Sequence, residues 1–260
     1  MPAWSPVPTA VPCATCPCST DTQPLPERAG ANMNPFKILS AISSGSFKGH
    51  FGQYGEDVIV RKLVKPNRGP GRYLDLGAFH PFRFSNTAYL WMCGWQGVNV
   101  DANANSIRLF DRVRRGDKNI CAAVVSEAEI ASGLTEVNLM LPQVTKTRDG
   151  ISALGSISSD RAELKELVRA VPVPTLSVNR ILAENSGEDI RYINIDIEGY
   201  DEKIACDIDL ARFRPEVISV EEYGPNLTAL ANSVVCQHLQ AHDYQLFARA
   251  GYTSIYVRED

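Results

Sequence analysis

Short apolar runs alternate with amphipathic segments in the first half of the chain, and this alternation restricts the fold more than any other feature. The runs have the length and composition of buried strands, and the segments between them place apolar residues at helical spacing. In chain order they are the strands Arg72–Leu76, Gly97–Asp101 and Asn119–Val125, separated by the helices Ser85–Trp91 and Ile107–Val113. A strand, helix, strand, helix, strand order predicts a parallel sheet with helices on both faces.

The boundaries of the two helices carry further signals. Ser85 or Asn86 is a residue type that caps a helix N-terminus. Arg112, Arg114 and Arg115 fall in the last turn of the second helix, where the helix dipole favours cations.

The rest of the chain continues the same α/β pattern. We predict a helix over Glu56–Leu63, a helix near Ser177–Ala183, strands at Arg191–Ile195 and Val217–Glu221, a helix over Leu227–Leu239, and β-runs at Tyr244–Arg249 and Thr253–Arg258. The last two runs are too close together to enclose a crossover helix, so they should form an antiparallel hairpin.

Two stretches depart from the pattern. Residues 1–34 are rich in Pro, Ala, Thr and Ser without periodicity, which predicts a disordered tail before a single domain at 35–260. Cys13, Cys16 and Cys18 in this tail lack the further ligands that a structural zinc site needs. A less regular stretch near 127–173, with a strand at Glu136–Leu141 and a helix at Asp160–Arg169, should cover the active site.

Charge and composition limit the partners. With 26 basic and 30 acidic residues the formal net charge is −4, which gives no overall attraction for nucleic acid or for an anionic membrane. No apolar run approaches the roughly 20 residues of a membrane span. Single cysteines within apolar segments, among the seven present, are typical of a reducing compartment, so we expect a cytoplasmic protein. No feature indicates an oligomeric state.

Acidic residues follow three of the predicted strands, at the edge where open parallel sheets bind ligands. Asp75 and Gly77 end the first strand, Asp101 ends the second, and Asp196 ends the strand at 191–195. A glycine lets the backbone approach a ligand, and a carboxylate after the second strand can accept both hydroxyls of a ribose. Each aspartate alone could equally cap a helix, but three together indicate a nucleoside-binding edge.

The turn after the first strand narrows the choice of nucleoside. It reads Asp75-Leu76-Gly77-Ala78-Phe79-His80-Pro81, without the second and third glycines that meet a pyrophosphate. A dinucleotide is therefore disfavoured, and a ligand without phosphate is preferred.

Several motifs, in this order, resemble the FkbM-type methyltransferases, a branch of the class I methyltransferase fold. They are Gln53-Tyr54-Gly55-Glu56-Asp57, Tyr73–Ala78, Ser85-Asn86-Thr87, Gly94–Val98, Asn194–Asp201 and Arg214–Glu221. The resemblance implies a Rossmann-like, seven-stranded, mostly parallel sheet with an antiparallel C-terminal strand. It also implies S-adenosylmethionine as methyl donor, and as acceptor a hydroxyl on a sugar or another small metabolite.

The resemblance also assigns residues to the cofactor. Asp75, Gly77 and Ala78 would line the methionine side, Asp101 would hold the ribose with Ala102 beside it, and Ala122 and Ala123 would lie near adenine. Asp101-Ala102-Asn103 stands where this family often has Glu-Pro-Asn, so the carboxylate has a shorter reach. Asp196 would face the methionine or the acceptor, and Gln53, with Glu56 and Asp57, would belong to a lid over the pocket.

Methyl transfer to a hydroxyl needs aligned reactants and gains from a general base. The candidates are His80, Asp196 and Glu198. His80 could instead cap the following helix, and Asp196 with Glu198 could also hold a divalent ion. Two other functions stay open: a nicotinamide-dependent oxidoreductase, and a non-catalytic binding module that has kept the fold.

Overall fold

The computed structural model describes residues 40, 43, 49–66, 69–142 and 168–259. By its internal contacts the chain divides into two units, residues 1–47 and 48–260. In the first unit only Ser40 and Ser43 are described, and both are helical. The predicted tail at 1–34 lies outside the described residues, and all of the architecture below belongs to the second unit.

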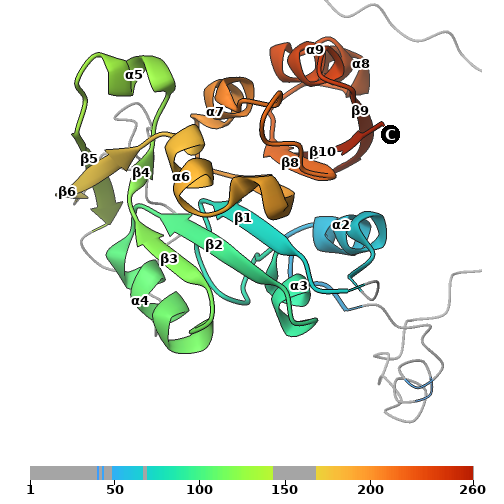
Figure 1. The fold of residues 1–260 in the computed structure, drawn as a ribbon, viewed down its shortest axis with the longest axis horizontal. Helices are drawn as coiled ribbons and strands as arrows, with labels where there is room; N and C mark the ends of the chain where they lie inside the picture. The colour runs from blue at the N-terminus through green and yellow to red at the C-terminus, as the bar shows by residue number, and fades with distance from the viewer. Residues whose placement is uncertain (1–39, 41–42, 44–48, 67–68, 143–167, 260) are drawn as a thin grey trace, which may run out of the picture. The chain divides into compact units, whose positions relative to one another are not determined.

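A seven-stranded sheet forms the centre of this unit (Figure 1). Its strands lie in the order β3-β2-β1-β7-β8-β10-β9. They are β1 (Arg72–Leu76), β2 (Gln96–Asp101), β3 (Lys118–Cys121), β7 (Ile190–Ile195), β8 (Val217–Glu221), β9 (Tyr244–Ala250) and β10 (Thr253–Arg258). Strands β3, β2, β1, β7 and β8 pair in parallel, whereas β10 is antiparallel to both of its neighbours. This confirms the predicted fold class and the C-terminal hairpin.

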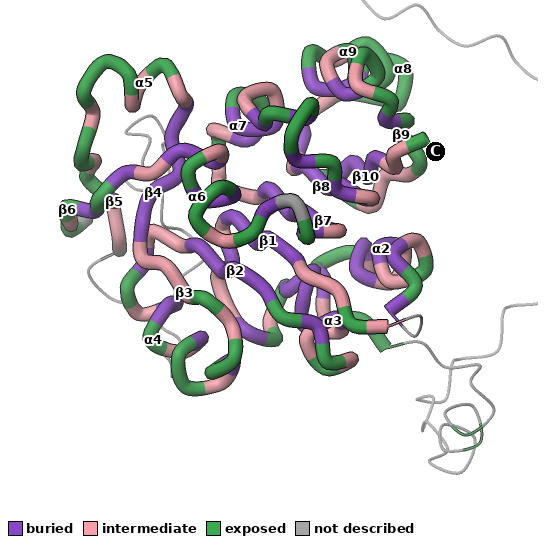
Figure 2. The backbone as a smooth tube through the Cα atoms, viewed as in Figure 1, coloured by how far each residue is buried: buried purple, intermediate pink, exposed green. Residues whose placement is uncertain are grey.

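Helices cover both faces of the sheet, so the central strands β1, β2, β7 and β8 are mostly buried (Figures 1 and 2). On one face, α2 (Glu56–Val64) and α3 (Ala88–Met92) bury Val60, Val64 and Leu90 against Trp95 and Tyr192. The larger core lies on the other face, under α6 (Val178–Glu184), α7 (Asp201–Asp207) and α9 (Val234–Gln240). The helix α4 (Ala104–Val113) follows β2 and begins at Asn103, whose side chain accepts a hydrogen bond from the Asn105 backbone N–H.

The third predicted strand is divided between two sheets. Only Lys118–Cys121 pairs with β2, and β4 (Ala123–Val124) leaves the main sheet to pair in parallel with β6 (Val168–Leu176). Strand β5 (Glu136–Pro142) then pairs antiparallel to β6, giving a three-stranded sheet of order β4-β6-β5. The helix α5 (Glu127–Ala131) joins β4 to β5 and has a capping box between Ser126 and Glu129.

The strand at 136–141 is thus confirmed, but β6 is not foreseen by the sequence pattern. Most of the predicted helix at 160–169 lies outside the described residues, and its last two residues belong to β6.

Two helix predictions are wrong at their boundaries. The helix predicted from Ser85 begins only at Ala88, because the side chains of Ser85, Asn86 and Thr87 bond to the core beneath them instead of capping. The helix predicted over 227–239 is broken into α8 (Leu227–Ala231) and α9, because the Ser233 side chain caps a new helix start at the Cys236 N–H.

Candidate functional site

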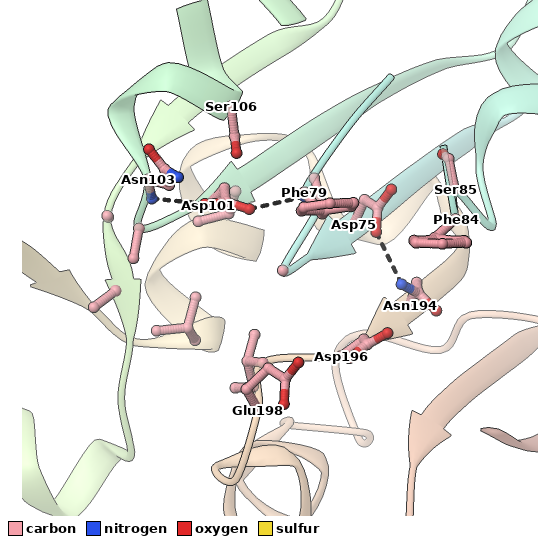
Figure 3. A pocket seen from close by; sticks show the side chains of 18 of the residues that line it. Asp75, Phe79, Phe84, Ser85, Asp101, Asn103, Ser106, Asn194, Asp196 and Glu198 are labelled. Carbon is pink, nitrogen blue, oxygen red and sulfur yellow. Dashed lines mark hydrogen bonds between the residues drawn. The ribbon is translucent and has the colours of Figure 1, made fainter. Parts of the chain in front are cut away.

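A pocket opens at the carboxyl ends of β1, β2 and β7, with a volume of about 1070 Å³ including the space open to solvent. Every predicted cofactor-binding residue lines it: Gln53, Asp75, Gly77, Ala78, Asp101, Ala102, Ala122, Ala123 and Asp196. Glu198 lines it as well (Figure 3). The topology explains this convergence, since parallel neighbours end at one edge of the sheet.

Gly77 is the position at which the pocket floor tolerates no side chain. Its φ is +78°, a left-handed value that favours glycine, and a Cβ there would lie 1.7 Å from the Asp196 carbonyl oxygen. The backbone N–H groups of Gly77 and Ala78 both donate to the Val100 carbonyl, at 2.9 and 3.0 Å. The ends of β1, β2 and β7 are therefore held close together around a glycine turn.

Asp101 stands at the end of β2 with its carboxylate already oriented. One oxygen accepts the Phe79 backbone N–H at 2.8 Å, and the other accepts the Asn103 N–H at 2.6 Å (Figure 3). Burial raises the pKa of Asp101 to about 6, against the lowering effect of these two hydrogen bonds. Each carboxylate oxygen keeps a second lone pair for a ligand hydroxyl.

Asp75 is buried beneath the pocket and anchors a polar network. Its two oxygens accept hydrogen bonds from Thr87 Oγ1 at 2.6 Å and Asn194 Nδ2 at 2.9 Å. Burial raises the pKa of this carboxyl, while Thr87, Arg114 and Asn194 oppose the rise. Asn194 in turn accepts a hydrogen bond from Asn86 Nδ2 at 3.1 Å, so Asp75 fixes two amides that line the pocket.

Arg114, which the sequence places at a helix end as a cation favoured by the dipole, supports the same network from the far side. It is fully buried. The two terminal nitrogens of its guanidinium lie within hydrogen-bond distance of five acceptors, which are Tyr73 Oη, Thr87 Oγ1, Asn99 Oδ1, the Pro81 carbonyl and Ser85 Oγ. Three of these partners belong to the segment 81–87, which carries pocket residues, so the buried cation holds that segment against the sheet.

Small and apolar residues line the side of the pocket next to the three-stranded sheet. Ala102, Ala122, Ala123 and Val124 face it together with Leu139 and Leu141 of β5. Leu139 also packs on Ala123 and Val173 in a small core of its own. Two residues of the predicted cover segment, Leu139 and Leu141, therefore line the pocket and extend its apolar side.

Asp196 and Glu198 place two carboxyl groups on the opposite side of the pocket (Figure 3). Burial raises the pKa of Asp196 well above its usual value, and the nearby Glu221, Asp201 and Glu198 raise it further. Oxygens of Asp196, Asp201 and Glu221 lie within 4.8 Å of one another. Asp201 has a structural task here, because its oxygens accept the Ile197 and Gly199 backbone N–H groups and so hold the turn that carries Glu198.

His80 is the predicted site residue that does not line the pocket in the described part of the chain. Its Nδ1 accepts the backbone N–H groups of Phe82 and Arg83, both at 3.0 Å. With Nδ1 accepting, the proton of the neutral ring resides on Nε2, which leaves no lone pair for proton abstraction.

Two buried carboxylates hold the segment that the sequence predicts to be a lid. Glu56 and Asp57 are buried, and their carboxylates accept the backbone N–H groups of residues 51–54, which orders the loop that carries Gln53. Gln53 itself is exposed and lines the pocket.

Other pocket residues are not assigned by the sequence. Phe79 and Phe84 stack at 6.1 Å between ring centroids, and both have a positive φ, as does Glu198. Asn86 and Asn194 lie within motifs that carry the family resemblance, so these motifs could have identified both residues as pocket residues. Leu139 and Leu141 belong to a strand whose position against the pocket has no local signature.

These features fit an S-adenosylmethionine molecule. The turn at Gly77 lets a ligand approach the protein main chain closely, and the Asp101 carboxylate can accept hydrogen bonds from ribose hydroxyls. The apolar side of the pocket, formed by alanine and leucine side chains, suits an adenine ring. The buried Asn86 Oδ1 has no hydrogen-bond partner among the described residues, and it lines the pocket where an α-ammonium group could donate to it.

Comparison with known proteins identifies the family of the chain. The family model described as methyltransferase FkbM domain matches residues 75–252. No curated protein matches the chain. Among the described residues, none of the helices has the length and apolar content to cross a bilayer.

A solved structure that resembles the chain is that of the Burkholderia thailandensis 1,6-didemethyltoxoflavin-N1-methyltransferase with bound 1,6-didemethyltoxoflavin and S-adenosylhomocysteine. The alignment covers 87% of this chain and 91% of that chain, with 12% identity and a TM-score of 0.36. At this identity and TM-score the likeness supports no conclusion about the fold or the function of this chain. The family match spans most of the folded unit, and the chain belongs to the FkbM methyltransferase family, with S-adenosylmethionine as its methyl donor.

Proposed function

We propose that this protein methylates a hydroxyl of a small polyol, most simply a saccharide, with Asp196 as the general base. The observation that carries the proposal is the position of Asp196 at the end of β7, lining the pocket beside the Gly77 turn. Its raised pKa makes the ionised carboxylate a stronger base than an exposed aspartate. An alcohol gives up its proton as the new bond forms, so a base at this position assists the transfer.

The remaining residues bind and orient. S-adenosylmethionine supplies an electrophilic methyl group on a sulfonium when bound. Asp101 is proposed to hold the ribose hydroxyls, Asn86 and Gln53 the methionine end, and Ala102, Ala122 and Ala123 the adenine. Asp75 holds Asn194 and Thr87 in place beneath them. Alignment of acceptor oxygen, methyl and sulfur is the main contribution of such a site.

The charge of the site favours a neutral acceptor. Asp196 and Glu198 line the pocket, and Glu221 lies close to Asp196. In their ionised form these carboxyl groups repel phosphates, which argues against nucleic acid and phosphorylated metabolites as acceptors. The described cysteines are free thiols, which is consistent with the proposed cytoplasmic location.

The test compares wild-type protein with Asp196→Asn and, as a matched control, Asp189→Asn, an exposed aspartate outside the pocket. Binding of S-adenosylhomocysteine is measured by calorimetry, and methyl transfer from a tritiated donor is measured on a panel of neutral saccharides, with EDTA and with Mg²⁺. Loss of a general base should lower turnover by about 10²–10⁴-fold. Affinity for S-adenosylhomocysteine should change less than about threefold in both variants.

Each alternative has its own outcome. Full turnover by Asp196→Asn would remove this residue from the chemistry. Binding of S-adenosylhomocysteine without transfer to any hydroxyl would leave the non-catalytic binding module. The nicotinamide-dependent alternative requires tight NAD binding, and the family match gives it no support.

A further inference from the structure

Three tyrosines form an exposed aromatic surface beside the pocket. Tyr54, Tyr223 and Tyr252 are 50%, 64% and 48% exposed. The rings of Tyr54 and Tyr252 meet edge to face with centroids 6.0 Å apart, and those of Tyr223 and Tyr252 lie 5.1 Å apart. We call these three residues the tyrosine platform. Aromatic residues gathered on a surface, rather than scattered singly, mark a binding site.

The backbone places the tyrosine platform at the same edge of the sheet as the pocket. Tyr223 follows the carboxyl end of β8, and Tyr252 lies in the turn of the β9–β10 hairpin, which pairs with β8 (Figure 1). The Glu222 backbone N–H donates to the Tyr252 carbonyl at 2.8 Å, which joins the two segments. Tyr54 packs so closely on Gly251 that a Cβ there would meet its ring at 2.1 Å.

Two contacts connect the tyrosine platform to the proposed reaction centre. Tyr223 Oη donates to Glu221 Oε1 at 2.8 Å, and carboxylate oxygens of Glu221 and Asp196 lie within 4.8 Å of each other. On the other side, Tyr54 directly follows Gln53, which lines the pocket. A molecule that presents a hydroxyl to Asp196 can therefore extend over the rings.

We propose that the tyrosine platform binds a second sugar ring of a neutral saccharide acceptor, while the first ring presents its hydroxyl to Asp196. This inference rests on the proposed function. The negative face of an aromatic ring attracts the C–H face of a pyranose, and the neighbouring carboxylates accept its hydroxyl groups. A nucleic acid would need a basic surface beside the rings. Arg249 lies there, but its guanidinium donates to the Gly251 and Glu222 carbonyls, and Tyr223 contacts the Glu221 carboxylate, so the charges beside the rings do not favour a nucleic acid.

The test uses the full chain and measures binding apart from turnover. Saturation-transfer NMR with protein saturated with S-adenosylhomocysteine compares cellobiose, maltose and lactose with the corresponding methyl glycosides of single sugars. Wild-type protein should bind at least one disaccharide more tightly than any monosaccharide, with magnetisation transferred to the C–H protons of the second ring.

Tyr252→Ala and Tyr223→Ala should each weaken disaccharide binding by about 2–13-fold, since one aromatic contact contributes about 0.5–1.5 kcal/mol. Tyr252→Phe, which keeps the ring, should retain the affinity. Binding of S-adenosylhomocysteine should be unchanged in all three variants, which also shows that they fold.

The outcomes separate the two proposals. Equal affinity of Tyr252→Ala and wild-type protein for the disaccharide overturns the tyrosine platform and leaves hydroxyl methylation standing. Disaccharide binding that needs the rings, without methyl transfer, supports the tyrosine platform and contradicts the proposed reaction. Failure of every saccharide to bind, or preferred binding of amines or apolar alcohols, overturns the inference.

Discussion

Replacing Arg114 by methionine tests whether the buried cation holds the pocket together. The side chain is fully buried and its terminal nitrogens contact five hydrogen-bond acceptors, so methionine fills part of the volume but serves none of these acceptors. The Pro81 carbonyl and Ser85 Oγ lose this donor, and Asp75 loses the cation that lowers its pKa. Removing one partner from a buried charged network typically costs about 3–5 kcal/mol.

The measurement is urea unfolding followed by circular dichroism, with Arg112→Met as the matched control. Arg112 is an exposed residue of the same helix, and its replacement should change the free energy of unfolding by less than about 0.5 kcal/mol. Arg114→Met should lose about 3–5 kcal/mol at an unchanged m-value. A loss below about 1 kcal/mol, or one no larger than that of Arg112→Met, would refute the assignment of Arg114 as a structural centre.

Three further predictions concern the pocket itself. Because burial raises the pKa of Asp101 to about 6, and the ionised carboxylate is the form that accepts ribose hydroxyls, affinity for S-adenosylhomocysteine should fall as the pH drops through about 6. Calorimetry should show this dependence for wild-type protein and a flat profile for Asp101→Asn; a flat wild-type profile would contradict the ribose assignment. Gly77→Ala should abolish cofactor binding or folding, because its Cβ would lie 1.7 Å from a carbonyl oxygen, whereas Gly133→Ala, with positive φ and open space, should cost only about 1–3 kcal/mol in thermal unfolding. His80→Asn should keep turnover within about threefold, since a side-chain oxygen can replace Nδ1 as the acceptor of the turn, and a hundredfold loss would show His80 to be the base.

The sequence predicts the sheet and the pocket edge well because both depend on local patterns. Apolar runs of strand length, separated by helical spacing, determine a parallel sheet, and its carboxyl edge collects whatever polar residues end the strands. Asp75, Asp101 and Asp196 meet at one pocket for that reason.

What the sequence does not predict depends on long-range packing. Arg114 has the same local signature as Arg112, and only the arrangement of β1, α3 and α4 makes one buried and the other exposed. The strand β6 reads Val-Arg-Ala-Val-Pro-Val-Pro-Thr-Leu, and its two prolines are disfavoured inside a strand, so the local pattern does not predict its pairing with β4 and β5. The tyrosine platform joins residues from three distant segments, each of which alone looks like an ordinary surface aromatic.

The left-handed backbone of Phe79, Phe84 and Glu198 has a consequence for engineering the protein. Each is a non-glycine residue at φ between 54° and 58°, a conformation that costs on the order of 1 kcal/mol or more, and all three line the pocket. Glycine at these positions would relieve the strain but also remove the rings or the carboxylate that shape the site. Thermostable variants are therefore better sought elsewhere in the fold, because stability gained at these three positions would come with the loss of side chains that line the pocket.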